Sequence, residues 1–277
     1  MAASANNLQV CTGDVGNAFL HGKTRERVFI IAGPEFGELA GIPLNIQGGL
    51  YGLRSSSARF HEHLSVKIRA MGYKPTKADP YLWMKEFETH NEYIATYVDD
   101  VLSFSKEPMK VIKAFEKDYV TKAIGKPRYY LGGDILDVPP HISTDTVQTM
   151  LSAHTYITRI VEKFEKLLGC CFKTRQTPMD ALYHPELEAT PLLSPDMHTK
   201  YRGLIGSANW MITLGRFDIA YAVNTLARYS MAPRQGHFDA MLRVFGYVKQ
   251  NPDGCIIIDP SIPAPPTHSS EQHNWTE

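Results

Sequence analysis

Two adjacent acidic residues, Asp99 and Asp100, stand between two apolar runs in the first half of the chain. The runs Tyr93–Val98 and Val101–Phe104 have the composition of β-strands, and a two-residue polar step between such runs predicts a tight hairpin. Neighbouring carboxylates repel each other, and a hard cation such as Mg²⁺ would neutralise them with the oxygen ligands it prefers. Asp also favours tight turns for conformational reasons, so for the pair taken alone a structural turn is the better interpretation.

The sequence around Asp99 and Asp100 favours a functional pair over a purely structural turn. Tyr97-Val98-Asp99-Asp100 matches the Tyr-x-Asp-Asp signature of reverse transcriptases, Asp14–Gly22 resembles the first palm motif of copia-type polymerases, and Gly49–Arg54 resembles their Ser-Leu-Tyr-Gly-Leu-Lys segment. Further matches follow in the same order at Ala78–Leu82, Tyr130–Gly132, Thr177–Asp180, Tyr201–Ser207 and Asp218–Val223. One short motif is weak evidence, but an ordered set over about residues 9 to 250 is strong. The chain therefore resembles the reverse transcriptase region of a copia-type LTR retrotransposon polyprotein.

The resemblance implies RNA-directed DNA polymerase activity by two-metal nucleotidyl transfer. In this chemistry the primer 3′-hydroxyl attacks the α-phosphate of a deoxynucleotide while two metal ions stabilise the attacking and leaving oxygens. By resemblance, Asp14 and Asp99 bridge both metals, Asp100 assists them, and the carbonyl of Val15 is a further ligand. The expected cofactor is Mg²⁺, with Mn²⁺ as an alternative.

Four residues are expected at the nucleotide. Phe19 falls where such polymerases place an aromatic ring under the sugar, and plain core packing is an equally good interpretation. Tyr51 and Gly52 would lie beside the incoming nucleotide, where Gly permits close approach of the backbone. Arg54 could face phosphate, although a solvated surface position is the simpler interpretation.

A second group is expected at the primer and template. The resemblance implies that Tyr97 and the turn Tyr130, Leu131 and Gly132 hold the primer end, and a simple β-turn is the alternative for the latter. Arg159, Lys163 and Lys166 follow one another at helical spacing within Tyr156–Leu168 and would contact the duplex backbone. An ordinary solvated helix face explains the same stripe equally well.

The composition excludes several classes of protein. Hydrophobic residues are 43% and charged residues 21%, and no apolar run approaches the roughly 18–20 residues of a membrane span. The formal net charge of +0 argues against a strongly basic nucleic-acid binder. The polar beginning lacks a signal peptide, and four cysteines without a disulfide-type spacing indicate reduced thiols. We therefore expect an intracellular, cytoplasmic protein without a membrane partner.

The pattern of elements predicts an α+β protein: a polymerase palm of antiparallel sheet and helices, followed by a mostly helical thumb and connection region. The expected domains are the palm at 1–145, a thumb-like segment at 146–175, a helical connection at 176–250, and a Pro-rich tail at 251–277 that has too little apolar residue content to fold. The main expected helices are Ser57–Met71, a helix from Pro108, Tyr156–Leu168, Tyr201–Leu214, Asp218–Met231 and His237–Gln250.

Several positions depart from the family pattern. Met1–Thr12 contains no Lys or Arg, so the basic fingers segment that should precede the first motif is missing, and we expect this chain alone to be inactive or weak. Gly49 replaces a serine and Phe217 replaces a proline. The expected partners are an RNA template, a DNA primer, deoxynucleotides and the rest of the polyprotein. Two alternatives stay open: an inactive relic of the family, and a non-catalytic palm that binds nucleic acid or protein.

Overall fold

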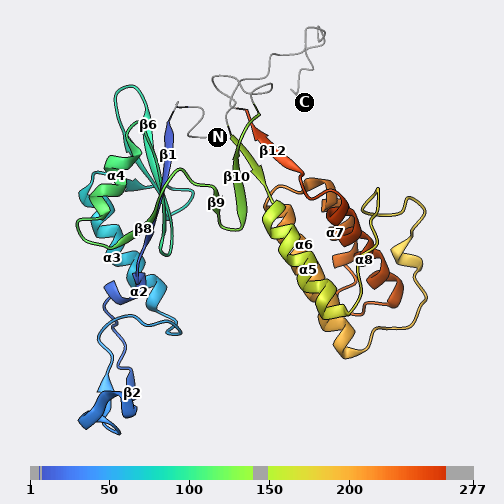
Figure 1. Ribbon diagram of the computed structural model, residues 1–277, viewed down its shortest axis with the longest axis horizontal. Coiled ribbons are helices and arrows are strands. Elements are labelled where there is room, and N and C mark those ends of the chain that lie inside the picture. Colours follow the sequence, from blue (N-terminus) through green and yellow to red (C-terminus); the bar gives the residue numbers. More distant parts are fainter. Residues whose placement is uncertain (1–5, 7, 140–148, 260–277) are drawn as a thin grey trace, which may run out of the picture. The chain divides into compact units, whose positions relative to one another are not determined.

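The computed structural model describes residues 6, 8–139 and 149–259. Contacts divide the chain into two compact units, Met1–Pro127 and Arg128–Glu277 (Figure 1). Helices and antiparallel sheets occur in both units, which confirms the predicted α+β class. Across the described residues no helix has the length and apolarity needed to cross a membrane.

Unit 1 is built on a six-stranded antiparallel sheet with the order β4-β5-β6-β7-β1-β8. Its strands are β1 (Gln9–Val15), β4 (Lys74–Pro75), β5 (Leu82–Glu86), β6 (Asn91–Tyr97), β7 (Asp100–Ser105) and β8 (Thr121–Gly125). Strand β1 alternates between buried and half-buried residues, as expected for a central strand whose two faces meet different surroundings. The first strand of the chain therefore lies in the interior of the sheet.

Two helices, α3 (Ser56–Ala70) and α4 (Pro108–Phe115), pack against one face of this sheet. Their apolar residues recur at helical spacing and enter a core with Trp83 and Ile94 of the sheet. Gly13 faces α4 so closely that a Cβ there would lie 3.2 Å from Cγ2 of Ile112. Because side chains alternate along a strand, Asp14 projects from the opposite face.

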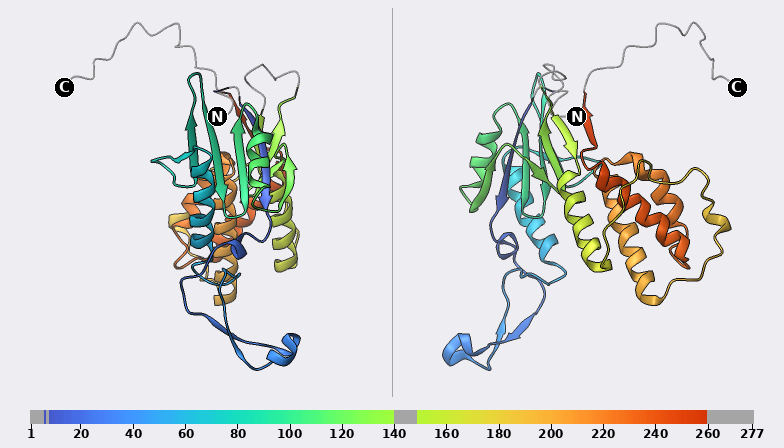
Figure 2. Two further views of the ribbon diagram at one scale, coloured as in Figure 1. Left: turned by 90° about the vertical axis from the view of Figure 1, so that its left-hand side faces the viewer. Right: turned by 45° about the vertical axis from the view of Figure 1, so that its right-hand side comes forward.

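A two-stranded arm leaves unit 1 between α2 (Ala18–His21) and α3. It consists of β2 (Phe29–Ile31), the 3₁₀ helix η1 (Pro34–Leu39) and β3 (Pro43–Asn45). Figures 1 and 2 both show the arm extending away from the six-stranded sheet. Ala32 is buried within it, but most of its large apolar side chains are exposed.

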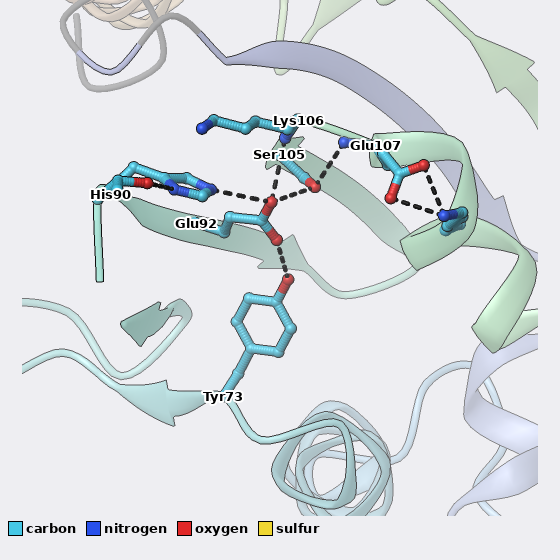
Figure 3. Close-up of polar contacts among 8 residues, drawn as sticks. Tyr73, His90, Glu92, Ser105, Lys106 and Glu107 are labelled. Atoms are coloured by element: carbon cyan, nitrogen blue, oxygen red, sulfur yellow. Dashed lines mark hydrogen bonds and ion pairs between the residues drawn. The ribbon is translucent and has the colours of Figure 1, made fainter. Parts of the chain in front are cut away.

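A buried carboxylate joins β6 to β7 at the ends remote from the Tyr97–Asp100 turn (Figure 3). Glu92 accepts hydrogen bonds from Ser105 Oγ at 2.6 Å, the Lys106 backbone N–H at 3.1 Å and the Tyr73 hydroxyl at 3.2 Å. His90 Nε2 lies 3.5 Å from the same carboxylate. Burial alone would raise the pKa of Glu92, but these hydrogen bonds outweigh it and hold the pKa below its usual range.

Unit 2 combines a four-stranded antiparallel sheet, in the order β12-β11-β10-β9, with a helical core. The strands are β9 (Tyr129–Tyr130), β10 (Gly133–Asp137), β11 (Thr149–Ser152) and β12 (Cys255–Ile258). The helices are α5 (His154–Leu168), α6 (Pro195–Thr213), α7 (Ala220–Ala227) and α8 (Gln235–Gln250), with short 3₁₀ turns η2 (Pro185–Leu187) and η3 (Phe217–Ile219). Figures 1 and 2 show these helices packed against one another around their common core.

A buried arginine holds the junction between α6 and α7. The Arg216 guanidinium donates to both carboxylate oxygens of Asp218, at 3.0 and 2.8 Å, and to the Asn251 carbonyl at 2.8 Å. Burial would raise the pKa of Asp218, but the hydrogen bonds and charge of Arg216 lower it overall. A bidentate pair of this kind fixes geometry as well as contributing energy.

The predicted domain bounds stay predictions beside two observations on chain organisation. The compact units divide at Pro127 and Arg128, whereas the predicted palm ends at residue 145, because β9 and β10 pair onward to β11 and β12 and so belong with the helices. Within the predicted Pro-rich tail at 251–277, Cys255–Ile258 form β12 and pair with Thr149–Ser152, while the part expected to be disordered begins at about Ile262. The rest of that tail from residue 260 lies outside the described residues.

We expect Glu92→Gln to lower the free energy of unfolding at pH 7 by about 1–3 kcal/mol, because a charged acceptor of several hydrogen bonds becomes neutral. The folded-state pKa of Glu92 lies below its ordinary value of 4.5. The stabilisation by the carboxylate is therefore complete above pH 4.5 and is lost as the pH falls through the folded pKa. Urea unfolding from pH 7 to pH 3 measures this.

The difference between wild type and Glu92→Gln should shrink in acid. Glu88→Gln, which changes an exposed carboxylate in the β5–β6 loop, serves as the control and should stay within about 0.5 kcal/mol of wild type at every pH. A difference that is independent of pH would show that Glu92 stabilises the fold through shape and not through charge.

Candidate active site

A row of four residues crosses the sheet of unit 1 at one end. Tyr97 on β6 is the direct partner of Asp100 on β7, Asp100 is the partner of Asp14 on β1, and Asp14 is the partner of Lys122 on β8. Directly paired residues in an antiparallel sheet project from the same face. The structure therefore gathers two of the predicted acidic residues on the sheet face that α3 and α4 leave uncovered.

Asp14 and Asp100 lie closer together than most paired residues. The backbone N–H of Val15 donates to the Asp99 carbonyl at 2.8 Å. This bond lies in the adjacent pair, Val15 opposite Asp99, so Asp14 and Asp100 form a non-hydrogen-bonded pair, in which the Cα atoms are typically about 4.5 Å apart. Asp99 is tied to β1 by the same bond, so the backbones of all three acidic residues lie at this end of the sheet.

The turn between β6 and β7 comes one residue earlier than the sequence predicted. Tyr97 pairs with Asp100, so Val98 and Asp99 form the two-residue turn and Asp100 is already part of β7. Val98 has φ 54°, in the left-handed region that β-branched residues avoid. Such a backbone costs on the order of 1–3 kcal/mol and persists where the surrounding structure imposes it.

The carboxylates influence one another. Burial raises the pKa of Asp100, and the negative charges of Asp99 and Asp14 raise it further. Within 6, 8–139 and 149–259, no three His, Cys, Asp or Glu side chains converge to form a metal site as they stand. The donor set nevertheless has the chemistry of a Mg²⁺ site, because it offers only oxygen ligands and an excess of negative charge.

Two residues predicted at the nucleotide contact each other. The ring centroids of Phe19 and Tyr51 are 4.8 Å apart in an edge-to-face arrangement. Phe19 is partly buried against the core of unit 1, whereas Tyr51 is 70% exposed. Phe19 therefore packs partly into the core, in line with the core-packing interpretation. The exposed ring of Tyr51 leaves one side of this aromatic pair open to a ligand.

Glycines permit this contact. A Cβ at Gly49 would lie only 2.6 Å from the Phe19 carbonyl oxygen, which gives a physical reason for glycine where the family pattern has serine. Gly52 has φ 98°, a conformation that favours glycine, in the turn that follows Tyr51. Ser56 Oγ donates to the Leu50 carbonyl at 2.7 Å and joins this turn to the start of α3. Arg54 is exposed.

The remaining predicted residues belong mostly to unit 2. Leu131 and Gly132 form the tight turn between β9 and β10, with φ 48° at Leu131 and 90° at Gly132, and Tyr130 is the last residue of β9, paired with Gly133. Arg159, Lys163 and Lys166 are exposed on α5, and Tyr97 is exposed at the end of β6 in unit 1. The turn interpretation of Tyr130–Gly132 and the solvated face of α5 are thus both correct as descriptions of local structure.

Lys122 was missed by the sequence analysis. It is exposed on β8 directly opposite Asp14 and is the one basic member of the row across the sheet. Strand β8, which carries Lys122, has only a weak β-strand pattern in the sequence. It pairs with β1, which lies more than 100 residues earlier in the chain. A basic residue beside the carboxylates has no local signal in the sequence.

The comparisons with known proteins agree with the motifs. The family model described as reverse transcriptase (RNA-dependent DNA polymerase) matches residues 1–181. That match covers more than half of the chain, which therefore belongs to this family.

The similar proteins indicate the type of transposable element from which this reverse transcriptase region comes. A putative transposon Ty5-1 protein of Saccharomyces cerevisiae is 28% identical over 248 residues, covering 88% of this chain and 77% of that protein. The Pol polyprotein from transposon TNT 1-94 of Nicotiana tabacum is 25% identical, over 94% of this chain and 20% of the polyprotein. The Ty1-ER2 Gag-Pol polyprotein of S. cerevisiae is 25% identical, over 95% and 15%. The chain is the reverse transcriptase region of a copia-type retrotransposon, and it spans a fifth or less of these two polyproteins.

We expect Val98→Gly to raise the free energy of unfolding by about 1 kcal/mol. Glycine adopts positive φ without steric cost, and this gain exceeds the roughly 0.5–1 kcal/mol that its greater freedom costs in the unfolded chain. Val98→Ala retains a Cβ and should recover less. Urea denaturation of the three proteins measures the order, and a loss of stability in Val98→Gly would mean that packing of the valine outweighs the strain.

We expect Asp100→Asn to stabilise the metal-free protein at pH 7 by about 0.5–1 kcal/mol, because it removes like-charge repulsion across β1 and β7. The raised pKa of Asp100 in the folded state leads to the same expectation. Because this pKa is above its ordinary value of 3.8, ionisation of Asp100 destabilises the folded state as the pH rises. Thermal unfolding with and without 10 mM Mg²⁺ measures both effects.

Adding Mg²⁺ should raise the melting temperature of wild type, because a ligand that binds the folded state stabilises it. Asp99→Asn and Asp100→Asn should show less of this gain, and Glu88→Gln should show all of it. An equal rise in melting temperature in all four proteins would mean that the cation does not bind at Asp14, Asp99 and Asp100.

Proposed function

We propose that this chain is the catalytic region of an RNA-directed DNA polymerase, which extends a DNA primer on an RNA template with deoxynucleotides. The observation that carries the proposal is the pairing of Asp14 with Asp100, with Asp99 joined to the same strand. Three acidic residues from two distant motifs lie at one end of a sheet, and nucleotidyl transfer by two metal ions needs carboxylates brought together from separate segments, which supports the proposal. The family match supports the same reaction.

The residues proposed to hold Mg²⁺, or Mn²⁺, are Asp14, Asp99, Asp100 and the carbonyl of Val15. The bound cations would supply the positive charge that activates the primer hydroxyl and stabilises the leaving pyrophosphate. The contribution of the chain is to hold its carboxylates on adjacent strands, where burial, and to a smaller extent the charges of Asp99 and Asp14, raise the pKa of Asp100.

Phe19 and Tyr51 are proposed to form the wall against the sugar of the nucleotide, because their rings are in contact and Tyr51 is exposed. Gly52 would allow the backbone to approach the ligand. Arg54 and Lys122 are exposed cations near these elements in unit 1 and are proposed to face the triphosphate. Preorganised cations of this kind stabilise charge that develops in phosphoryl transfer.

The polymerase subdivisions are proposed as follows. The sheet and helices of unit 1 correspond to the palm, α5 to a thumb-like segment within 146–175, and α6–α8 to the connection within 176–250. Tyr97 and the turn Tyr130–Gly132 would hold the primer end. The exposed basic stripe of α5, Arg159, Lys163 and Lys166, would neutralise backbone phosphates of the duplex.

The test is extension of a labelled DNA primer on an RNA template with Mg²⁺. We expect little extension by the 277-residue chain and clear extension when the preceding segment of a relative, such as the TNT 1-94 Pol polyprotein, is fused ahead of Gln9. Asp99→Asn in the fusion should reduce the rate at least 100-fold, equivalent to about 2.7 kcal/mol of transition-state stabilisation.

Glu88→Gln in the fusion is the matched control, since it removes a carboxylate outside the acidic row, and it should retain the full rate. Extension that survives Asp99→Asn would contradict the proposed carboxylates. A well-folded fusion without any extension would favour the alternative of an inactive relic.

A further inference from the structure

An exposed tryptophan lies where α6 meets the β9–β10 turn of unit 2. Trp210 is 41% exposed, although tryptophan is highly buried on average. Its indole packs against the turn: a Cβ at Gly132 would lie only 2.9 Å from Nε1 of Trp210, so the absence of a side chain at Gly132 makes room for the ring. The turn therefore holds the indole in place, while part of the ring stays open to solvent.

The helix surface next to this ring is open. A long side chain on a helix extends over the turn that precedes its own Cα, so the indole of Trp210 leans toward residues 206 and 207. Gly206 has no side chain, and a Cβ built there would have nothing within 4 Å. Glycine is unfavourable in the interior of a helix, but here it leaves free space beside an exposed aromatic ring.

A second exposed aromatic residue lies near the same place. Tyr129 on β9 is 43% exposed and pairs directly with Asp134, so both project from one face of their sheet. Asp134 accepts a hydrogen bond at 2.9 Å from the Thr155 N–H, in the first turn of α5, which places Tyr129 on the side of α5. The Tyr156 hydroxyl donates to the Ser207 carbonyl at 3.5 Å and joins this end of α5 to α6, one turn before the tryptophan.

Two arginines lie next to these residues. Arg159 follows Tyr156 by three residues on α5, and Arg202 precedes Gly206 by four on α6, so each pair is adjacent on its helix surface. Both arginines are exposed, and neither belongs to the ion pairs formed within the described part of unit 2. Arg202 and Trp210 are about 12 Å apart along the helix axis, at a rise of about 1.5 Å per residue, which leaves room for about one nucleotide between their side chains.

We propose that this surface of unit 2 binds single-stranded nucleic acid, with an unpaired base stacked on Trp210 and the neighbouring phosphates at Arg202 and Arg159. Exposed aromatic rings flanked by unpaired cations bind single strands in this way, because every base has a face that can stack. Binding is therefore tolerant of sequence, with a dissociation constant of roughly 1–100 µM. It is independent of the proposed polymerase activity, because neither the acidic row nor Mg²⁺ takes part in it.

The first experiment measures fluorescence anisotropy of labelled oligo(dT) and oligo(U), each of about twelve nucleotides, with the 277-residue chain in EDTA. Trp210→Leu should weaken the binding of both roughly fivefold or more, because leucine is apolar but cannot stack, whereas Trp210→Phe should retain most of it. A blunt DNA duplex of the same length should bind wild type and Trp210→Leu equally. Tyr221→Ala is the matched control, since it removes a 77% exposed aromatic ring on α7, and it should bind like wild type.

The second experiment separates binding from folding. Gly206→Gln keeps the tryptophan and favours the helix, so the melting temperature should stay the same or rise. Its side chain fills the space between Trp210 and Arg202, so oligo(dT) binding should still weaken roughly fivefold or more. Thr199→Gln places the same side chain at an exposed position two turns earlier on α6 and should bind like wild type. Arg202→Gln should lower the slope of log affinity against log salt by roughly 0.7, the value for one phosphate contact on a single strand.

Three outcomes would overturn the proposal: no binding of either oligonucleotide, full binding by Trp210→Leu, or full binding by a stably folded Gly206→Gln. Equal weakening of single-strand and duplex binding by Trp210→Leu would also overturn it, because the indole would then support a general contact and not a stacked base. Asp99→Asn should bind oligo(dT) like wild type, so loss of polymerase activity and loss of this site are separately observable.

Discussion

The pairing of β1 with β7 is the constraint on which the candidate site depends. It places Asp14 opposite Asp100 in a non-hydrogen-bonded pair and ties Val15 to Asp99. A shift of one residue in this register would turn one carboxylate toward α3 and α4 and separate it from the other. The register is held by burial, because Val15 and Val101 must face the helices for the core of unit 1 to form.

The hairpin of β6 and β7 carries destabilising groups at one end and stabilising hydrogen bonds at the other. At the Val98 end, β6 and β7 carry repelling carboxylates and a valine with positive φ, both of which disfavour folding. At the other end, Glu92 accepts three hydrogen bonds, from Ser105 and Lys106 at the end of β7 and from Tyr73 before β4, and so holds the strands together. A site that concentrates negative charge requires compensation elsewhere, and here part of that compensation lies at the opposite end of the same hairpin.

The arm and the acidic row are different kinds of surface within unit 1. The row is polar, with Asp14 and Asp100 half-buried between the exposed Tyr97 and Lys122, and it is supported by a core on the opposite face of its sheet. The arm has no such core, and its apolar side chains face solvent on a sheet of two strands. Surface of this kind is typical of a site that another polypeptide covers.

Much of the local structure followed from the sequence. The helices Ser56–Ala70, Pro108–Phe115, His154–Leu168 and Gln235–Gln250 were predicted closely, because each carries apolar residues at helical spacing with a recognisable beginning or end. The family was also evident from the ordered motifs. The four-stranded sheet of unit 2 was not predicted, because its strands are short and β12 comes from a segment more than 100 residues away from its partner β11.

The sequence by itself determined which residue types are available for chemistry: adjacent carboxylates at Asp99 and Asp100, a third at Asp14, and aromatic residues at Phe19 and Tyr51. Apolar–polar alternation and turn-forming residues are local features of the sequence, so they can be recognised without knowledge of the fold. Only the tertiary structure decided that Asp100 is the partner of Asp14, that the turn consists of Val98 and Asp99, and that Lys122 stands beside the carboxylates. These depend on register between distant strands, which is set by burial of the whole core and has no counterpart in any single segment.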